Sequence, residues 1–172
     1  MDAAKPVPWR AAIGLGANLG EARQTLREAV AALAGQAGVR LLGLSSLYAS
    51  APVDAQGPDF LNAAVLLETT LRPLALLDAL QALELAHGRL RPYRNAPRTL
   101  DLDLLLGETA NGTLLTIDHP RLSLPHPRWD QRAFVLRPLA ELLPAQVPAA
   151  ALARVQDQAI RIAEAGPAWG LA

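Results

Sequence analysis

The sequence predicts an α+β protein in which helices pack on an antiparallel sheet. Stretches with strand character at 9–18, 39–50, 60–69 and 98–107 alternate with two stretches whose apolar residues recur at helical spacing. The turn between the second and third strands is too short for a parallel crossover, so we expect these strands to be antiparallel. The chain has 172 residues, of which 51% are apolar, and this suffices for one domain with a substantial core.

The first half of the chain predicts strand, helix, strand, strand. From Trp9 a buried strand leads into the glycine-rich segment GLGANLG, and a helix follows in which Leu26, Val30 and Leu33 share one face. Next come VRLLGLSSLYAS, without a clean helical period, and FLNAAVLLET. Both are rich in apolar residues, which favours strands.

The second half adds a helix from Pro73 to Gly88, an arginine-rich loop at 89–97 and the strand RTLDLDLLLG. The resulting order, βαββαβ, is that of a ferredoxin-like fold. Right-handed crossovers would place the first and last of these strands side by side in the middle of the sheet.

The C-terminal part predicts less regular structure. We expect a small hairpin at 113–117, a loop rich in proline, histidine and arginine at 118–130, and a helix at 131–143. The expected organisation is therefore one domain at 1–145 and an alanine-rich tail at 146–172. One weak helix with frayed ends would make this tail a helical C-terminal extension.

Composition excludes several classes of protein. With no cysteine, disulfides, thiolate metal sites and cysteine nucleophiles are impossible. No apolar run approaches the ~18 residues of a membrane span, so we expect a soluble cytoplasmic protein without a membrane partner. The formal net charge is zero, and only seven residues are aromatic, which argues against nucleic acid as a partner.

The cations nevertheless gather locally. Fifteen of the 16 are arginines, and eight of these lie between positions 89 and 137 against five acids. The planar arginine side chain suits bidentate contacts to phosphate or carboxylate.

Asp101 and Asp103 are the most informative pair in the sequence. Alternation along a strand places both carboxylates on one face, about 7 Å apart. Two carboxylates that keep room for water and phosphate are typical of Mg²⁺ sites. An exposed strand with polar residues facing outward is the ordinary alternative, but four arginines lie within the twelve residues before the pair. Carboxylates for metal beside arginines for phosphate indicate phosphoryl transfer.

Other motifs are weaker. GLGANLG lacks the third glycine of a dinucleotide fingerprint and the lysine of a P-loop, so a tight strand-to-helix turn is the better interpretation. His119 and His126 lack the spacing of a zinc pair and are better suited to contact phosphate or ribose.

Taken together, the motifs resemble the 6-hydroxymethyl-7,8-dihydropterin pyrophosphokinase family. The segment APRTLDLDLLLG is similar to the family signature. Further similar segments follow the family's order: IGLGANLG, SSLYASAP, FLNAAV, ELAHGR, LPHPR and RAFVLRPL. The resemblance covers positions 10–143 and implies transfer of pyrophosphate from ATP to the hydroxymethyl group of the pterin, with release of AMP, in folate biosynthesis.

The resemblance also implies roles for individual residues. Asp101 and Asp103 would bind two Mg²⁺ ions and, with Arg89 and Arg98, form the catalytic set. The implied ATP-binding positions are Gln81, Glu84, Arg89, Arg91, Arg98, Arg121, His126 and Arg132. The implied pterin-binding positions are Ser50, Val53, Phe60, Asn62 and Phe134. ATP and the pterin would be the only partners of a monomer.

The sequence departs from the family pattern before the signature, where Asn95 and Ala96 replace a common tryptophan and glycine. Two other functions stay open. A ligand-binding or assembly module without activity explains the fold, and a metal-dependent phosphodiesterase would use the same carboxylates.

Overall fold

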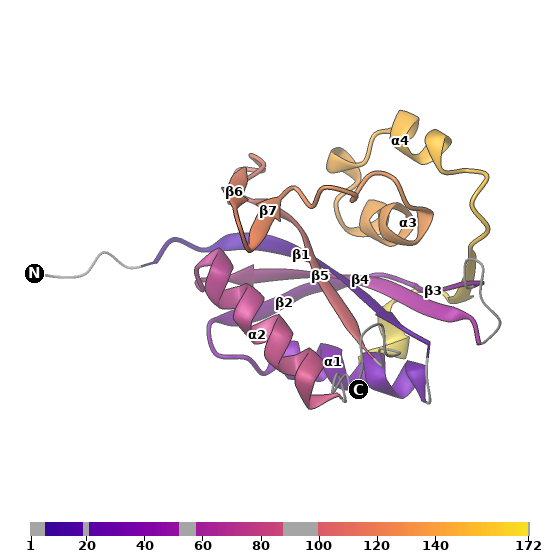
Figure 1. Cartoon of the computed structure of the whole chain (residues 1–172), viewed down its shortest axis with the longest axis horizontal. Helices are drawn as coiled ribbons and strands as arrows, with labels where there is room; N and C mark the ends of the chain where they lie inside the picture. The colour runs from indigo at the N-terminus through magenta and orange to yellow at the C-terminus, as the bar shows by residue number, and fades with distance from the viewer. Residues whose placement is uncertain (1–5, 19–20, 52–57, 88–99, 172) are drawn as a thin grey trace, which may run out of the picture.

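The computed structural model describes residues 6–18, 21–51, 58–87 and 100–171. In these residues helices lie on both faces of an antiparallel sheet (Figure 1). The elements in chain order are β1 (Trp9–Ala17), α1 (Ala22–Ala34), β2 (Val39–Leu44), β3 (Leu47–Ser50), β4 (Phe60–Thr69), α2 (Pro73–Ala86), β5 (Asp101–Glu108), β6 (Ile117–His119), β7 (Leu122–Leu124), α3 (Ala133–Leu142), α4 (Ala149–Arg154) and β8 (Arg161–Glu164).

The main sheet has the strand order β5-β1-β4-β3-β8, and β2 also pairs with β4. Every pairing in it is antiparallel, which confirms the expected sheet class. The first strand and the strand at 98–107 are predicted to be neighbours, and the pairing of β1 with β5 confirms this. The prediction that both strands lie in the middle of the sheet is wrong for β5. This strand is at the edge, and β1 lies between β5 and β4.

Helices α1 and α2 cover one face of the sheet (Figure 1). Their apolar stripes are buried there against the apolar residues of β1 and β4 that face the same side. The buried stripe consists of Leu26, Val30, Leu33, Leu76 and Leu80. Both helices lie where the leucine spacing predicts them.

Helix α3 covers part of the opposite face (Figure 1). Leu136 and Leu139 are fully buried in a second cluster with Ala12, Leu105 and Leu106. Leu105 of this cluster, and Ala133 at the start of α3, also line the pocket that is described below.

The predicted strand at 39–50 is two strands. β2 and β3 are separated at Ser45 and Ser46, and both pair with β4. Long-range hydrogen bonds hold the break: the Ser45 hydroxyl accepts from the Ala64 N–H (2.9 Å), and the Ser46 N–H and hydroxyl both donate to Glu141 of α3 (3.0 Å each). Local sequence carries no sign of these partners.

The predicted hairpin is displaced. At 113–117 the described structure has an isolated bridge between Glu108 and Leu114 with a backbone hydrogen bond on either side of it. The hairpin of two strands is formed by β6, which begins at Ile117, and β7, so most of it lies inside the predicted loop at 118–130. Leu122 and Leu124 are buried in the core under α2, and this burial fixes the hairpin.

The C-terminal residues are more ordered than a weak helix with frayed ends. α4 is followed by β8, which pairs with β3, and by Trp169, which is buried and donates its indole N–H to the Ser45 carbonyl (2.8 Å). None of the helices in the described part of the chain is long and apolar enough to cross a membrane.

Candidate active site

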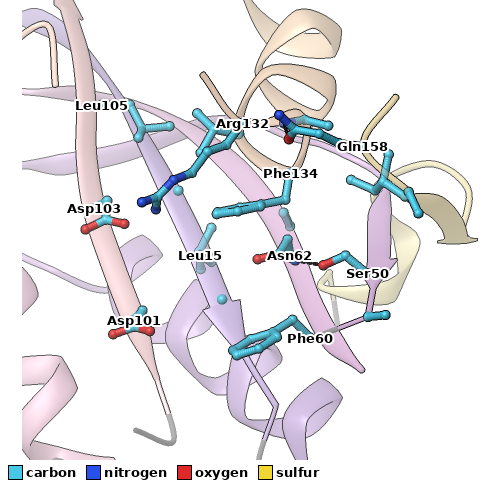
Figure 2. Close-up of a pocket in the computed structure, with 18 residues that line it drawn as sticks. Leu15, Ser50, Phe60, Asn62, Asp101, Asp103, Leu105, Arg132, Phe134 and Gln158 are labelled. Carbon is cyan, nitrogen blue, oxygen red and sulfur yellow. Dashed lines mark hydrogen bonds between the residues drawn. The ribbon is translucent and has the colours of Figure 1, made fainter. Parts of the chain in front are cut away.

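A cavity of about 840 Å³ lies between the sheet and the N-terminal end of α3 (Figure 2). Four strands and the segment after α4 contribute to it. The residues that line it are Gly14, Leu15, Gly16, Ser50, Ala51, Phe60, Asn62, Ala63, Asp101, Asp103, Leu105, Arg132, Ala133, Phe134, Val135, Gln158, Ala159 and Ile160.

Glycines on the central strand β1 form part of the pocket surface. Gly14 and Gly16 are two positions apart, so both lie on the pocket face, and the adjacent Ile13 and Leu15 are buried in the core under α1 and α2. A Cβ on Gly14 would meet Leu105 at 3.3 Å, and one on Gly16 would meet the Asn62 side chain at 3.1 Å. These glycines therefore belong to the strand and make room for pocket side chains, so the prediction that GLGANLG is a tight turn is wrong for Gly14 and Gly16.

Asn62 is the buried amide of the site. It lies on β4 between Gly16 of β1 and Tyr48 of β3, with 5% of its surface exposed. Its Nδ2 donates to the Ser50 hydroxyl (3.2 Å). This bond orients the amide, and its remaining donor and acceptor capacity lies at the pocket wall.

Asp101 and Asp103 lie on β5 and both line the pocket, as alternation along the strand predicts (Figure 2). A β-bulge follows them: Ala12 pairs with Leu106 and Ile13 with Leu104, so Leu105 has no partner on β1. The extra residue lets the adjacent Leu105 and Leu106 both enter the core under α3. This core anchors the strand just beyond the two carboxylates.

Helix α3 begins at the pocket edge with Arg132 as its N-cap residue and Phe134 in its first turn. The Arg132 guanidinium lies 5.5 Å from the centre of the Phe134 ring, a cation–π contact that orients both side chains. In Figure 2 the Arg132 side chain extends toward Asp103, and the rings of Phe60 and Phe134 lie on either side of Asn62.

A second group of predicted residues lies outside the pocket lining, around β5, α2 and the β6–β7 hairpin. The buried Glu84 of α2 accepts a hydrogen bond from the Leu102 N–H (3.1 Å), and Leu102 is the residue between the two aspartates. Arg121 pairs with Asp78 of α2 and contacts Gln81 at 3.4 Å. These bonds join the hairpin, the helix and the aspartate-bearing strand.

His126 also lies outside the pocket lining. Its backbone N–H donates to the Leu105 carbonyl (2.8 Å), so the loop that carries it is attached to the bulge of β5. Its Nδ1 accepts from the Arg128 N–H at 3.2 Å.

The structure thus brings seven predicted residues into one pocket. Two others, Glu84 and His126, bond to its edge strand β5, and Gln81 of α2 contacts Arg121. Arg89, Arg91, Arg98 and Val53 lie outside the described residues. In the part of the chain that the structure describes, no group of three or more histidine, aspartate or glutamate side chains is placed to hold a metal ion.

Sequence reasoning missed the contribution of the C-terminal segment. Gln158, Ala159 and Ile160 line the pocket although the tail has no recognisable motif. For Gly14 and Gly16 a signal was present, since glycines two apart on a strand share one face. For the C-terminal segment no local pattern predicts the contact.

An α+β fold with two aspartates, an arginine, a buried amide and two aromatic rings around one pocket fits the class of enzymes that transfer a phosphate-containing group to a flat polar acceptor. Comparison with known proteins narrows this class. The sequence profile of the 7,8-dihydro-6-hydroxymethylpterin-pyrophosphokinase family matches residues 12–144, and the chain belongs to this family.

Individual relatives support the same family assignment. The 2-amino-4-hydroxy-6-hydroxymethyldihydropteridine pyrophosphokinase of Pseudomonas aeruginosa is 47% identical over 137 residues, covering 78% of this chain and 81% of that protein. The Bacillus subtilis protein of the same name is 40% identical over 151 residues, 87% of each chain. The folic acid synthesis protein fol1 of Schizosaccharomyces pombe is 34% identical over 133 residues, which are 77% of this chain and 18% of that protein.

Proposed function

We propose that this protein transfers pyrophosphate from ATP to the hydroxymethyl oxygen of 6-hydroxymethyl-7,8-dihydropterin, giving the pterin diphosphate and AMP in folate biosynthesis. Family membership over residues 12–144 supports the reaction. The observation that carries it is the single pocket that combines Asp101 and Asp103 with Asn62, Phe60 and Phe134. A pterin is a flat bicycle with a polar edge, and the acceptor oxygen must reach the phosphates.

The pterin end of the site would be the part between β3, β4 and α3. Rings of Phe60 and Phe134 offer faces for stacking, and Asn62 offers an amide to the donor and acceptor groups of the heterocycle. Ser50 holds that amide through the 3.2 Å hydrogen bond. Val53, outside the described residues, stays a predicted pterin contact.

The donor set at β5 fits Mg²⁺. Asp101 and Asp103 present two oxygen-bearing side chains to one pocket, and Mg²⁺ is typically bound by one or two carboxylates together with substrate phosphates. A cage of three or more protein ligands is not required for such a site. When bound, two Mg²⁺ ions would neutralise the reacting phosphates and lower the pKa of the acceptor hydroxyl.

The ATP end of the site would extend from these aspartates toward the β6–β7 hairpin and α2. Arg132 brings a permanent positive charge to the pocket side of β5. Gln81, Arg121 and His126 lie around the same strand, and Glu84 holds its backbone at Leu102. Arg89, Arg91 and Arg98 stay predicted phosphate contacts.

The chain's own contribution to the reaction would be alignment and charge. The aromatic and amide groups hold the acceptor, the arginines hold the phosphates, and the walls of the cavity exclude water that would otherwise hydrolyse ATP. No side chain needs to act as a strong base if the acceptor hydroxyl is acidified.

The strand order β5-β1-β4, with β2 and β3 on the far side of β4, supports the ferredoxin-like description of residues 9–108. The profile match that ends at residue 144 supports a pyrophosphokinase unit of 1–145 followed by the segment 146–172. The monomeric state and the cytoplasmic location stay predictions.

One assay tests the function. The protein is incubated with Mg²⁺, ATP and the reduced hydroxymethylpterin, and the nucleotide products are separated. AMP that forms only when the pterin is present is the expected result. Pterin-independent hydrolysis would indicate a phosphodiesterase or ATPase, ADP would indicate an ordinary kinase, and no turnover would indicate a binding module.

A further inference from the structure

The segment after α4 forms one wall of the pocket. Gln158, Ala159 and Ile160 line it beside Phe134 and Val135 (Figure 2). The segment lies beyond the matched residues 12–144. Its contribution is thus separate from the motifs that define the family.

Gln158 holds the N-terminus of α3 from both sides. Its Oε1 accepts a hydrogen bond from the Ala133 N–H (2.8 Å), and its Nε2 donates to the Gln131 carbonyl (3.0 Å). These two residues flank Arg132. The N-cap residue of α3 makes no side-chain capping bond of its own, so Gln158 supplies the missing acceptor from a distant part of the chain.

The same segment is tied to the other walls of the pocket. β8, which starts at Arg161, pairs with β3, the strand that ends at Ser50. The Arg161 side chain forms an ion pair with Asp59 (3.0 Å), the residue before Phe60. Three pocket elements are thereby attached to one short stretch of chain.

We propose that Gln158 is a positioning residue of the pterin pocket, which fixes the first turn of α3 so that Arg132 and Phe134 face the substrates. This inference rests on the proposed function. Its physical basis is that the two hydrogen bonds of Gln158 fix the backbone on both sides of Arg132, and a shift of this backbone moves Arg132 and Phe134 together. A displaced binding group weakens the contacts that it makes with the substrate.

The test compares Q158M with Q156M. Methionine keeps the length of glutamine but neither donates nor accepts these hydrogen bonds, and Gln156 is an exposed glutamine outside the pocket lining. The first measurement is amide hydrogen exchange by NMR, which needs no catalysis. We expect the Ala133 amide of Q158M to exchange at least about tenfold faster than in the parent protein, with the Leu139 amide unchanged.

The second measurement is steady-state kinetics. Q158M should raise KM for the pterin about fivefold and leave kcat within about twofold, because the lost alignment weakens binding of ground state and transition state alike. Q156M should match the parent protein in both measurements. A Q158M protein with parental KM, or with parental exchange at Ala133, would overturn the proposal.

A second variant guards against a simple loss of folding. Q158E keeps an acceptor for the Ala133 N–H, so its Ala133 exchange and its KM should lie between those of the parent and Q158M. A KM as high as that of Q158M despite protected Ala133 would contradict positioning through this bond. If the parent protein forms no AMP with the pterin, the proposed function fails, whereas the exchange data still decide whether Gln158 holds α3.

Discussion

Gly16 of β1 lies directly opposite Asn62 of β4, and a Cβ on Gly16 would come within 3.1 Å of the Asn62 side-chain oxygen. This approach is closer than an ordinary van der Waals contact. The absence of a side chain at position 16 is therefore what lets the Asn62 amide lie against the sheet and face the pocket. The glycine at position 16 thus helps to set the orientation of the Asn62 amide in the pocket.

Gly16→Ala should impair pterin binding while leaving the protein folded. The new methyl group pushes on the Asn62 amide, and we expect KM for the pterin to rise about tenfold, since one misplaced hydrogen-bonding group costs on the order of 1 kcal/mol. Alanine is the better residue in a strand, so the free energy of unfolding should change by less than about 1 kcal/mol. Gly35→Ala, at a helix end with ordinary contacts, is the matched control. An unchanged KM in Gly16→Ala would contradict this role of Asn62.

Asp101→Asn and Asp103→Asn should each lower kcat by at least about a thousandfold if the two carboxylates hold the metal ions that the phosphates require. Asparagine keeps the shape and removes the charge. Asp118→Asn on the exposed β6 is the control, which should keep parental activity. Circular dichroism and melting temperature show whether the variants are folded. Near-parental turnover of either variant would refute the two-metal assignment.

Much of the site followed from short-range periodicity. Alternation along a strand was enough to place Asp101 and Asp103 on one face, and both line the pocket. The same rule would have placed Gly14 and Gly16 there, but glycine was interpreted by its common role in turns. Family resemblance supplied Phe60, Asn62 and Phe134, which no spacing rule would have grouped.

The remaining features depend on contacts between distant residues. The break at Ser45 and Ser46 is held by Glu141 and Trp169, and the bulge at Leu105 is bonded to the His126 N–H. The pocket wall at Gln158 depends on Ala133. Such contacts leave no periodic pattern in the sequence, because each one involves single residues that can be any distance apart along the chain.

The pH dependence of stability should report the partly buried hydrogen bond between Tyr48 and Glu141. Burial, and next this bond, raise the pKa of Tyr48 to about 12 from an ordinary value of 10.0. The unfolded chain therefore loses its phenolic proton first as the pH rises. The free energy of unfolding should fall between pH 10 and 12, by up to about 2–3 kcal/mol.

Urea unfolding at pH 9 and pH 11 measures this effect. Tyr48→Phe has no phenolic proton, so the decline between the two pH values should be smaller in the variant than in the parent protein. Other groups that titrate in this range are the same in both proteins and cancel in the comparison. Equal declines would mean that Tyr48 does not titrate as its surroundings indicate.

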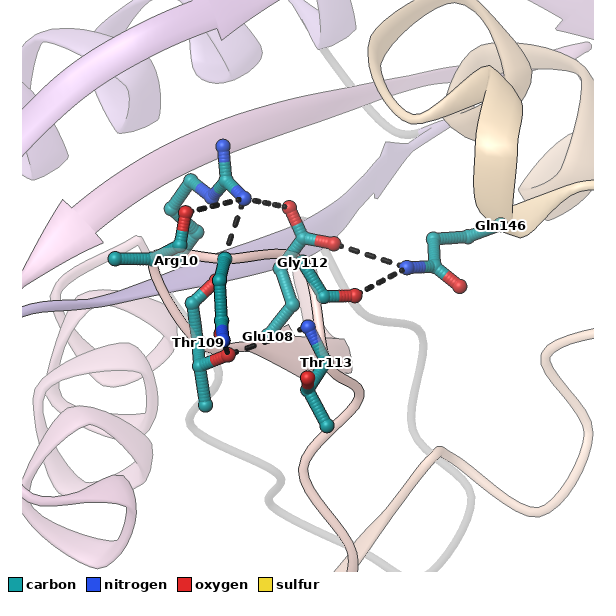
Figure 3. A network of polar contacts seen from close by, with 8 residues as sticks. Arg10, Glu108, Thr109, Gly112, Thr113 and Gln146 are labelled. Atoms are coloured by element: carbon teal, nitrogen blue, oxygen red, sulfur yellow. Dashed lines mark hydrogen bonds and ion pairs between the residues drawn. The ribbon is translucent and has the colours of Figure 1, made fainter.

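A different network holds the sheet at the end of β5 away from the aspartates (Figure 3). Glu108 is 4% exposed and forms an ion pair with Arg10 of β1 (2.8 Å), while its other oxygen accepts from Gln146 (3.0 Å). Arg10 also donates to the Thr109 carbonyl, and Gln146 to the Gly112 carbonyl. The network joins two strands, a turn and the single 3-10 turn Pro144–Gln146 that follows α3, and none of these residues lines the pocket.

Glu108→Ala should therefore reduce stability without altering catalysis. Removing the buried carboxylate takes the anionic partner from Arg10 and one of the two acceptors from the Gln146 amide, and we expect a loss of about 2–3 kcal/mol in the free energy of unfolding. Glu68→Ala is the matched control: Glu68 pairs with Arg40 at 3.0 Å across neighbouring strands of the same sheet, but in solvent, where such a pair contributes less than about 1 kcal/mol. Urea unfolding gives both values, and KM for the pterin should be parental in both variants. If Glu108→Ala lowers the free energy of unfolding no more than Glu68→Ala does, burial adds nothing to the stability of the Arg10–Glu108 pair. If Glu108→Ala raises KM for the pterin, the end of β5 is coupled to the pocket.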